Sequence, residues 1–138
     1  MLIASGVNVF GVTRPNISKN IDDVRSIEID LSENWDTEVL PERIDCIFHL
    51  AQSSRFRDFP ERSMDVFNVN INSTARLLDY ARRVGAKKFI YASTGGLYEN
   101  GPKELTENAP LVPLGKLGHY YGSKACGEIL VQSYASEF

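Results

Sequence analysis

Apolar residues gather in four short runs that predict β-strands. The runs are Val7–Thr13, Ser26–Leu31, Asp45–Ala51 and Lys87–Ala92, each followed by proline, glycine or polar residues. The third run, DCIFHLA, is apolar enough to be buried on both faces, as strands of parallel sheets are. The pattern therefore predicts a parallel sheet.

Two longer segments have the spacing of helices. Apolar or small residues recur along one side between Glu61 and Val84, and Gly85 follows where a helix would end. The second predicted helix runs from Tyr120 to about Ala135. The remaining expectations are a last helical turn at Met1–Gly6, a short helix within Ser32–Pro41 capped by Ser32, and a long loop at Asn100–Gly118.

Strands that alternate with helices predict an α/β fold, a partial Rossmann-like parallel sheet with flanking helices in three αβα layers. In open sheets of this kind, ligands bind beyond the carboxyl ends of the strands. Thr13, Asp30, Ala51 and Thr94 fall at those ends. We therefore expect a small-molecule site there.

Composition narrows the class of partner. The 138 residues are the length of one domain, and a hydrophobic content of 43% is ample for its core. The net charge of −3, with both signs mixed, gives no sign of a nucleic-acid or membrane-surface binder. Without an apolar run long enough to span a bilayer, or a leader, a cytoplasmic protein is expected, with Cys46 and Cys126 as buried, reduced thiols.

The segment Tyr120-Tyr121-Gly122-Ser123-Lys124 places a phenol and an ammonium one helical turn apart on one face. A neighbouring cation favours the phenolate and lowers the pKa of a tyrosine, which makes it a usable proton carrier. A solvated helix start is the alternative. The motifs elsewhere in the chain favour the chemical interpretation.

The set HLAQSS, VNINST, FIYASTGGLY and YYGSK resembles the extended short-chain dehydrogenase/reductase family of NAD(P)-dependent nucleotide-sugar epimerases and dehydratases. The resemblance covers about Leu2 to Phe138. It implies that Tyr120 is the acid/base, that Lys124 holds the nicotinamide ribose and lowers the pKa of Tyr120, and that Thr94 hydrogen-bonds the reacting oxygen of the substrate. A carbinol that loses hydride to nicotinamide must also give up its hydroxyl proton.

The same resemblance implies the cofactor-binding residues. Besides Tyr120 and Lys124, they are Arg14, Asp30, Leu31, Leu50, Ala51, Gln52 and Asn70. Asp30 could instead be a solvent-facing acid, and Asn70 a core amide bonded to backbone. Arg14 follows Thr13 where an acidic residue would bind a ribose 2′-OH, so the pattern favours NADP over NAD, although Arg14 could be a plain loop cation.

No metal site is expected, because neither His49 nor His119 has a Cys, Asp or Glu at ligand spacing. Both are interpreted as structural histidines. Gly95-Gly96 stand where dehydratases of the family have Asp-Glu, which favours an epimerase or a reductase. A non-catalytic nucleotide-binding or scaffold protein is the alternative function, and a homodimer through Glu61–Val84 and Tyr120–Phe138 is expected from resemblance alone.

The glycine-rich phosphate turn that opens the family's pattern is not found in this sequence, and neither is the lobe that selects the sugar. We therefore expect residues 1–138 to be one incomplete NAD(P)-binding Rossmann domain, without a second domain. Loss of a central strand would expose the edges of its neighbours and an apolar surface. Feeble binding of NADP(H) by these residues alone follows as a prediction.

Overall fold

The computed structural model describes residues 5–17, 23–98, 105–112, 115 and 117–138. Its strands are β1 (Val9–Thr13), β2 (Val24–Glu28), β3 (Cys46–His49) and β4 (Lys88–Tyr91). Its helical segments are the 3₁₀ turns η2 (Thr37–Val39) and η4 (Gly95–Leu97), the α-helices α1 (Ser63–Phe67), α2 (Ser73–Val84) and α3 (Gly118–Glu137), and the π-helical turn η3 (Asn68–Asn72). All four predicted strands are present, and each is shorter than its apolar run.

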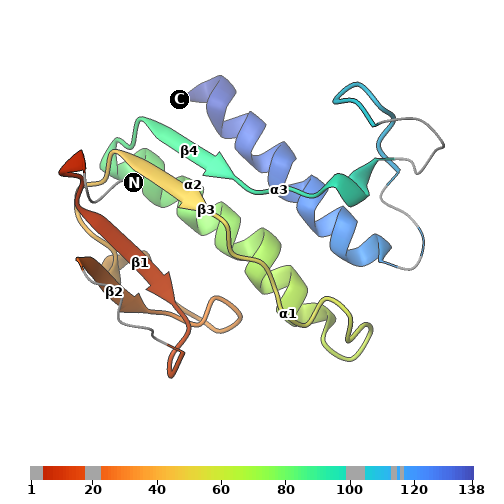
Figure 1. Ribbon diagram of the computed structural model, residues 1–138, viewed down its shortest axis with the longest axis horizontal. Helices are drawn as coiled ribbons and strands as arrows, with labels where there is room; N and C mark the ends of the chain where they lie inside the picture. Colours follow the sequence, from red (N-terminus) through yellow and green to blue (C-terminus); the bar gives the residue numbers. More distant parts are fainter. Residues whose placement is uncertain (1–4, 18–22, 99–104, 113–114, 116) are drawn as a thin grey trace.

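The strands form two parallel pairs, which confirms the α/β class. Thr13 of β1 lies opposite Glu28 of β2, and His49 of β3 lies opposite Tyr91 of β4. Within the described residues β1 and β3 do not pair, so the sheet is in two parts. Helices α2 and α3 contact each other and lie together behind β3 and β4 (Figure 1).

The opposite face of the β3–β4 pair is open. Phe48 and Ile90 are register partners on that face, and their exposed fractions are 51% and 41%. Fifteen large hydrophobic residues are exposed in the described part of the chain, including Val12 and Leu50. Unpaired strand edges and an apolar surface are therefore both present among the described residues.

The second strand lies two to three residues earlier than predicted. It ends at Glu28, and the Asp30 carboxylate accepts hydrogen bonds from the Ser32 backbone N–H (2.9 Å) and from its hydroxyl (2.7 Å). This local turn draws the chain out of the sheet and engages Ser32, so the predicted cap of a helix at Ser32 is wrong. Only the short turn η2 forms within Ser32–Pro41, and Asp36 caps it.

The predicted helix at Glu61–Val84 is broken into α1, η3 and α2. Its apolar side is buried as expected, with Val66, Leu78 and Ala81 less than a tenth exposed. Gly85 ends it in the left-handed conformation at φ +70°, as the glycine predicted. The π turn was not predicted, because its wider hydrogen-bond spacing leaves no compositional mark.

The closing helix α3 begins two residues before the predicted Tyr120 and ends two after Ala135. Cys126 is exposed on its outer side, and Cys46 is half-buried, so the expectation of two buried thiols is wrong. Most of the predicted turn at Met1–Gly6 lies outside the described residues, but Gly6 has a φ of +75° that suits a helix end. Within the described residues no helix is long and apolar enough to span a bilayer.

Candidate active site

A pocket of about 380 Å³ lies at the carboxyl ends of β1, β2 and β3. Five of the predicted cofactor-binding residues line it: Arg14, Asp30, Leu31, Ala51 and Gln52. Leu50 does not, because alternate side chains of a strand point to opposite faces, and its side chain is 65% exposed. The sheet thus brings together residues from positions 14 to 52, as its parallel topology requires.

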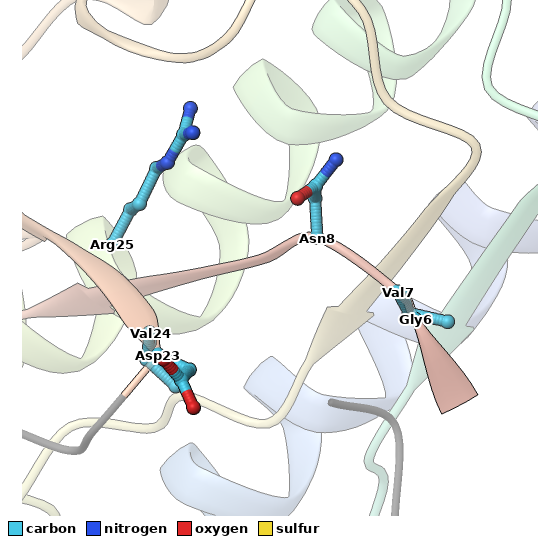
Figure 2. Close-up of a pocket in the computed structure, with 6 residues that line it drawn as sticks. All are labelled: Gly6, Val7, Asn8, Asp23, Val24 and Arg25. Atoms are coloured by element: carbon cyan, nitrogen blue, oxygen red, sulfur yellow. The ribbon is translucent and has the colours of Figure 1, made fainter. Parts of the chain in front are cut away.

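A second pocket, of about 430 Å³, lies at the amino ends of β1 and β2. Figure 2 shows Asn8 and Arg25 pointing to one side of it and Asp23 to the other. None of the predicted site residues line this pocket. Its polar groups do not converge, so the pocket at the carboxyl ends is the better candidate despite its smaller volume.

The polar groups of the candidate pocket are arranged around Arg14. Its guanidinium donates to the Ser54 hydroxyl (3.3 Å). The hydrogen bonds from Ser32 hold the pKa of Asp30 below its ordinary value, with a smaller contribution from the Arg14 charge. The Thr13 hydroxyl oxygen is buried and has no hydrogen-bond partner among the described residues. An unpartnered hydroxyl on a residue that lines the pocket suits a polar ligand.

Tyr120 lies in the first turns of α3, and its phenol donates a hydrogen bond to the Gln52 side-chain oxygen. Its ring lies tilted against that of Phe56, with ring centroids 4.7 Å apart and an interplanar angle of 34°. Burial raises the pKa of Tyr120, and the Thr94 side chain partly opposes that rise. Thr94, three residues after β4, caps η4 by accepting from the Gly96 N–H (3.3 Å).

Lys124 is almost fully buried, with 1% of its surface exposed. Its ammonium lies 4.5 Å from the centroid of the Tyr91 ring. Burial lowers the pKa of Lys124, and Glu128 opposes this. The expectation that Lys124 lowers the pKa of Tyr120 is wrong for this geometry, because the ammonium faces Tyr91 and the burial of the phenol dominates.

Asn70 is fully buried and joins β3 to α3. Its side-chain oxygen accepts from the Ser53 backbone N–H (3.0 Å), and its amide nitrogen donates to the Ser123 hydroxyl (2.9 Å). Ser123 in turn donates to the Tyr120 carbonyl (2.7 Å). These are the contacts of a core amide, and they fix the two segments that carry Gln52 and Lys124.

The sequence interpretation missed two members of this arrangement and one contact of a third. Gln52 was predicted as a cofactor contact, yet it also bonds the Tyr120 phenol; Ser53 and Ser123 were not singled out. Their positions beside predicted site residues were the available signal.

Both histidines have structural contacts. His49 is buried, with its Nε2 3.0 Å from the Thr74 hydroxyl, and burial, with the charge of Lys124, lowers its pKa to about 4. His119 Nε2 lies 2.8 Å from the Phe56 carbonyl. Among the residues that the structure describes, no three His, Cys, Asp or Glu side chains are grouped to hold a metal ion.

Known proteins of one family resemble this chain. It is 34% identical over 94 residues to the dTDP-D-glucose 4,6-dehydratase of Mus musculus, covering 67% of this chain and 26% of that protein. It is 29% identical over 119 residues to the UDP-glucose 4-epimerase of Mycolicibacterium smegmatis, covering 85% and 37% respectively. The chain thus spans about a quarter to a third of these relatives.

Solved structures also resemble this chain. The Thermus thermophilus UDP-glucose 4-epimerase in complex with NAD matches 99% of this chain and 46% of its own, with a TM-score of 0.81 and 25% identity. MoeE5 in complex with UDP-glucose and NAD matches 98% and 43%, with a TM-score of 0.79 and 25% identity. The model of the NAD dependent epimerase/dehydratase family matches residues 1–138. The chain therefore belongs to the NAD-dependent epimerase/dehydratase family.

Proposed function

We propose that the protein that carries this chain is an NAD(P)-dependent epimerase or reductase acting on a nucleotide sugar. The observation that supports this most is the meeting of Tyr120 of α3 with Gln52, which follows β3, and Thr94, which follows β4. A phenol held by one acceptor and approached by one hydroxyl is equipped to pass a proton.

In this proposal Tyr120 exchanges a proton with the reacting hydroxyl of the sugar, while Thr94 hydrogen-bonds the same oxygen and orients it. The raised pKa of Tyr120 keeps the phenol protonated at neutral pH, so it is poised to donate before it accepts. Gln52 holds the phenolic oxygen in place between these events. The burial of Tyr120, at 8% exposed, limits proton exchange with water.

The pocket residues fit a dinucleotide. Of the residues that line the pocket, Asp30 and Leu31 would contact the adenine, Thr13 and Arg14 the adenosine ribose, and Ala51 and Gln52 the part of the cofactor between the two ends. Lys124, which does not line this pocket, would hold the nicotinamide ribose. The unpartnered Thr13 hydroxyl is the observation in favour, because a ribose or phosphate oxygen would satisfy it. The bound cofactor supplies the hydride acceptor and donor.

NADP is the proposed form, since Arg14 lines the pocket and the strand ends in Thr13 rather than an acid. The two solved structures named above contain NAD, and the dissociation constants of NADP⁺ and NAD⁺ test the proposed form. A 2′-phosphate would compete with Ser54 for the Arg14 guanidinium.

A dehydratase is disfavoured by the space around Gly96. A Cβ at this position would lie 2.2 Å from the Tyr121 ring, so no side chain fits there unless that ring moves. Dehydratases of the family have a glutamate at the equivalent of Gly96. The ring of Tyr121 takes up the room that such a carboxylate needs.

The test is turnover of the complete protein with a panel of nucleotide sugars and both cofactors. Tyr120→Phe removes the proton carrier and should abolish turnover, whereas Tyr134→Phe, a matched change farther along α3, should leave it intact. Thr94→Val should reduce turnover by roughly a hundredfold or more. Unchanged turnover in Tyr120→Phe would reject this assignment, and cofactor binding without any turnover would favour the non-catalytic alternative.

The proposal extends to a homodimer through the helices. Met64 and Phe67 of α1 and Ile129 of α3 are exposed apolar side chains on helices that contact each other. A partner helix pair would cover them. Sedimentation equilibrium of the complete protein with Met64→Glu and Ile129→Glu tests this, and a mass unaffected by these changes would contradict it.

A further inference from the structure

The strongest feature outside the proposed proton transfer is the environment of Lys124. Its ammonium has no carboxylate within ion-pairing distance among the described residues, although its surface is 1% exposed. A charge buried without a counter-ion is costly and needs some compensating interaction. The face of the Tyr91 ring, 4.5 Å from the ammonium, supplies one.

The Tyr91 ring is itself held in a defined place. Tyr91 ends β4 opposite His49, and the two ring centroids are 5.7 Å apart. On the other side a Cβ at Gly127 would lie 2.2 Å from the Tyr91 hydroxyl oxygen. Helix α3 can therefore approach β4 this closely only because Gly127 has no side chain.

Core packing alone does not explain why position 91 holds a tyrosine. It is buried without a hydrogen-bond partner in the described part of the chain, although Thr74 lies near enough to affect its acidity. Burial raises the pKa of Tyr91 to about 12, so the ring stays neutral. A neutral aromatic face is what an adjacent cation requires.

We propose that Tyr91 is a positioning residue that holds the Lys124 ammonium against its ring face, and that Gly127 makes this contact possible. The proposal rests on the function proposed above for its catalytic consequence. The geometric part stands without it. Tyr91 thereby fixes the distance between Lys124 and Tyr120, one helical turn apart on α3.

The charged and titratable groups around Lys124 determine the sign of the expected effect. They are His49 from β3, Tyr91 from β4, and Glu128 and Tyr120 from α3. Of these, Glu128 favours the charged ammonium, and His49 is neutral above acid pH. Burial lowers the pKa of Lys124, and the ring face opposes this because it favours the charged ammonium. Without the ring, the pKa of Lys124 falls further, and the alkaline limb of the pH–rate profile moves to lower pH.

The test compares Tyr91→Leu with Tyr91→Phe in the complete protein, and Phe89→Leu in the same strand serves as the control. NMR of the labelled lysine side chains, with the Lys124 signal assigned by its loss in Lys124→Arg, reports the geometry directly. A ring face above the ammonium shifts that signal upfield. The upfield shift and the pKa of Lys124 should be unchanged in Tyr91→Phe and Phe89→Leu. In Tyr91→Leu the upfield shift should be lost and the pKa of Lys124 should be lower.

Measurements of turnover test the catalytic consequence of the proposal. Tyr91→Leu should lower kcat/KM by roughly three- to tenfold, the range that a partly desolvated cation–π contact is worth, while Tyr91→Phe should not. If the wild type turns over no nucleotide sugar, the proposed function fails, and the NMR arm still decides the contact. If Tyr91→Leu does not fold, pentafluorophenylalanine at position 91 keeps the shape and reverses the ring electrostatics, and it should lower the Lys124 pKa.

A Lys124 signal and pKa that are the same in Tyr91→Leu, or in the fluorinated variant, as in the wild type would overturn the proposal. So would a Tyr91→Phe protein that behaves like Tyr91→Leu, because the ring is still present in it. Gly127→Ala provides an independent check: displacement of the Tyr91 ring should remove the upfield shift while the helix itself is retained. Retention of the shift there would contradict the role assigned to Gly127.

Discussion

Replacement of Asn70 by alanine should destabilise the protein more than any other single change at a polar residue of the site. Asn70 is fully buried and both of its polar atoms are engaged. Truncation leaves the Ser53 backbone N–H without its acceptor, which costs about 1–3 kcal/mol. It also removes the bond to Ser123, worth about 1 kcal/mol, because Ser123 keeps its bond to the Tyr120 carbonyl.

The expected loss in the free energy of unfolding is therefore about 2–4 kcal/mol, a large share of the stability of an ordinary domain. Asn72→Ala is the matched control. It lies in the same turn η3, is half-buried, and makes no side-chain hydrogen bond to another described residue. The free energy of unfolding of Asn72→Ala should stay within about 0.5 kcal/mol of the wild-type value.

Urea unfolding of the complete protein, followed by circular dichroism and analysed by linear extrapolation, measures both variants. Asn70→Asp separates the two bonds, since it keeps an acceptor for Ser53 and loses the donor to Ser123; it should fall between wild type and Asn70→Ala. Equal stability losses in Asn70→Ala and Asn72→Ala would refute the reasoning. So would an Asn70→Ala loss below about 1 kcal/mol.

Three further predictions follow from charge and ligand binding. The pKa of His49 is about 4 in the folded protein against an ordinary value of 6.5, so the unfolded chain binds the proton first as the pH falls. The contribution of neutral His49 to the free energy of unfolding is therefore full above pH 6.5 and falls by about 3 kcal/mol as the pH approaches 4. His49→Gln should reduce the difference between the free energies of unfolding measured in urea at about pH 7 and about pH 4.5. Arg14→Asp should reverse the ratio of the dissociation constants of NADP⁺ and NAD⁺ in the complete protein, measured by fluorescence titration, and an unaltered ratio would make Arg14 a loop cation. Residues 1–138 alone should bind NADP(H) feebly, and tight binding by isothermal titration would contradict the role assigned to a glycine-rich turn.

The sequence predicted the elements of this fold better than their limits. Apolar runs located all four strands, because buried strands need apolar side chains wherever they lie. Their ends depend on pairing: the second strand stops at Glu28 because Asp30 bonds Ser32 locally. The exposure of Cys126 depends on how α3 packs, which no local pattern records.

The candidate site was likewise predicted only in part. The residues near the pocket followed from strand ends and from the family motifs, since parallel topology brings those ends to one edge. The pairing of side chains did not follow. Lys124 lies against Tyr91 rather than lowering the pKa of Tyr120, and Gln52 bonds the phenol; both contacts depend on the rotation of α3 against the sheet.

The π-helical turn η3 absorbs one residue between α1 and α2 with little change in the phase of the two helices. A regular α-helix advances about 100° per residue, and a π turn holds one residue more than an α turn. Because the π turn spreads that extra residue over nearly the same rotation, deletion of one residue from Asn68–Asn72 would restore regular winding and leave α1 close to its present orientation. Val66, now 2% exposed, would stay in the core. The turn thus holds one residue that the helix can lose without exposing the buried face of α1, and a one-residue deletion there should be tolerated better than one within α2, where it shifts the phase by about 100°.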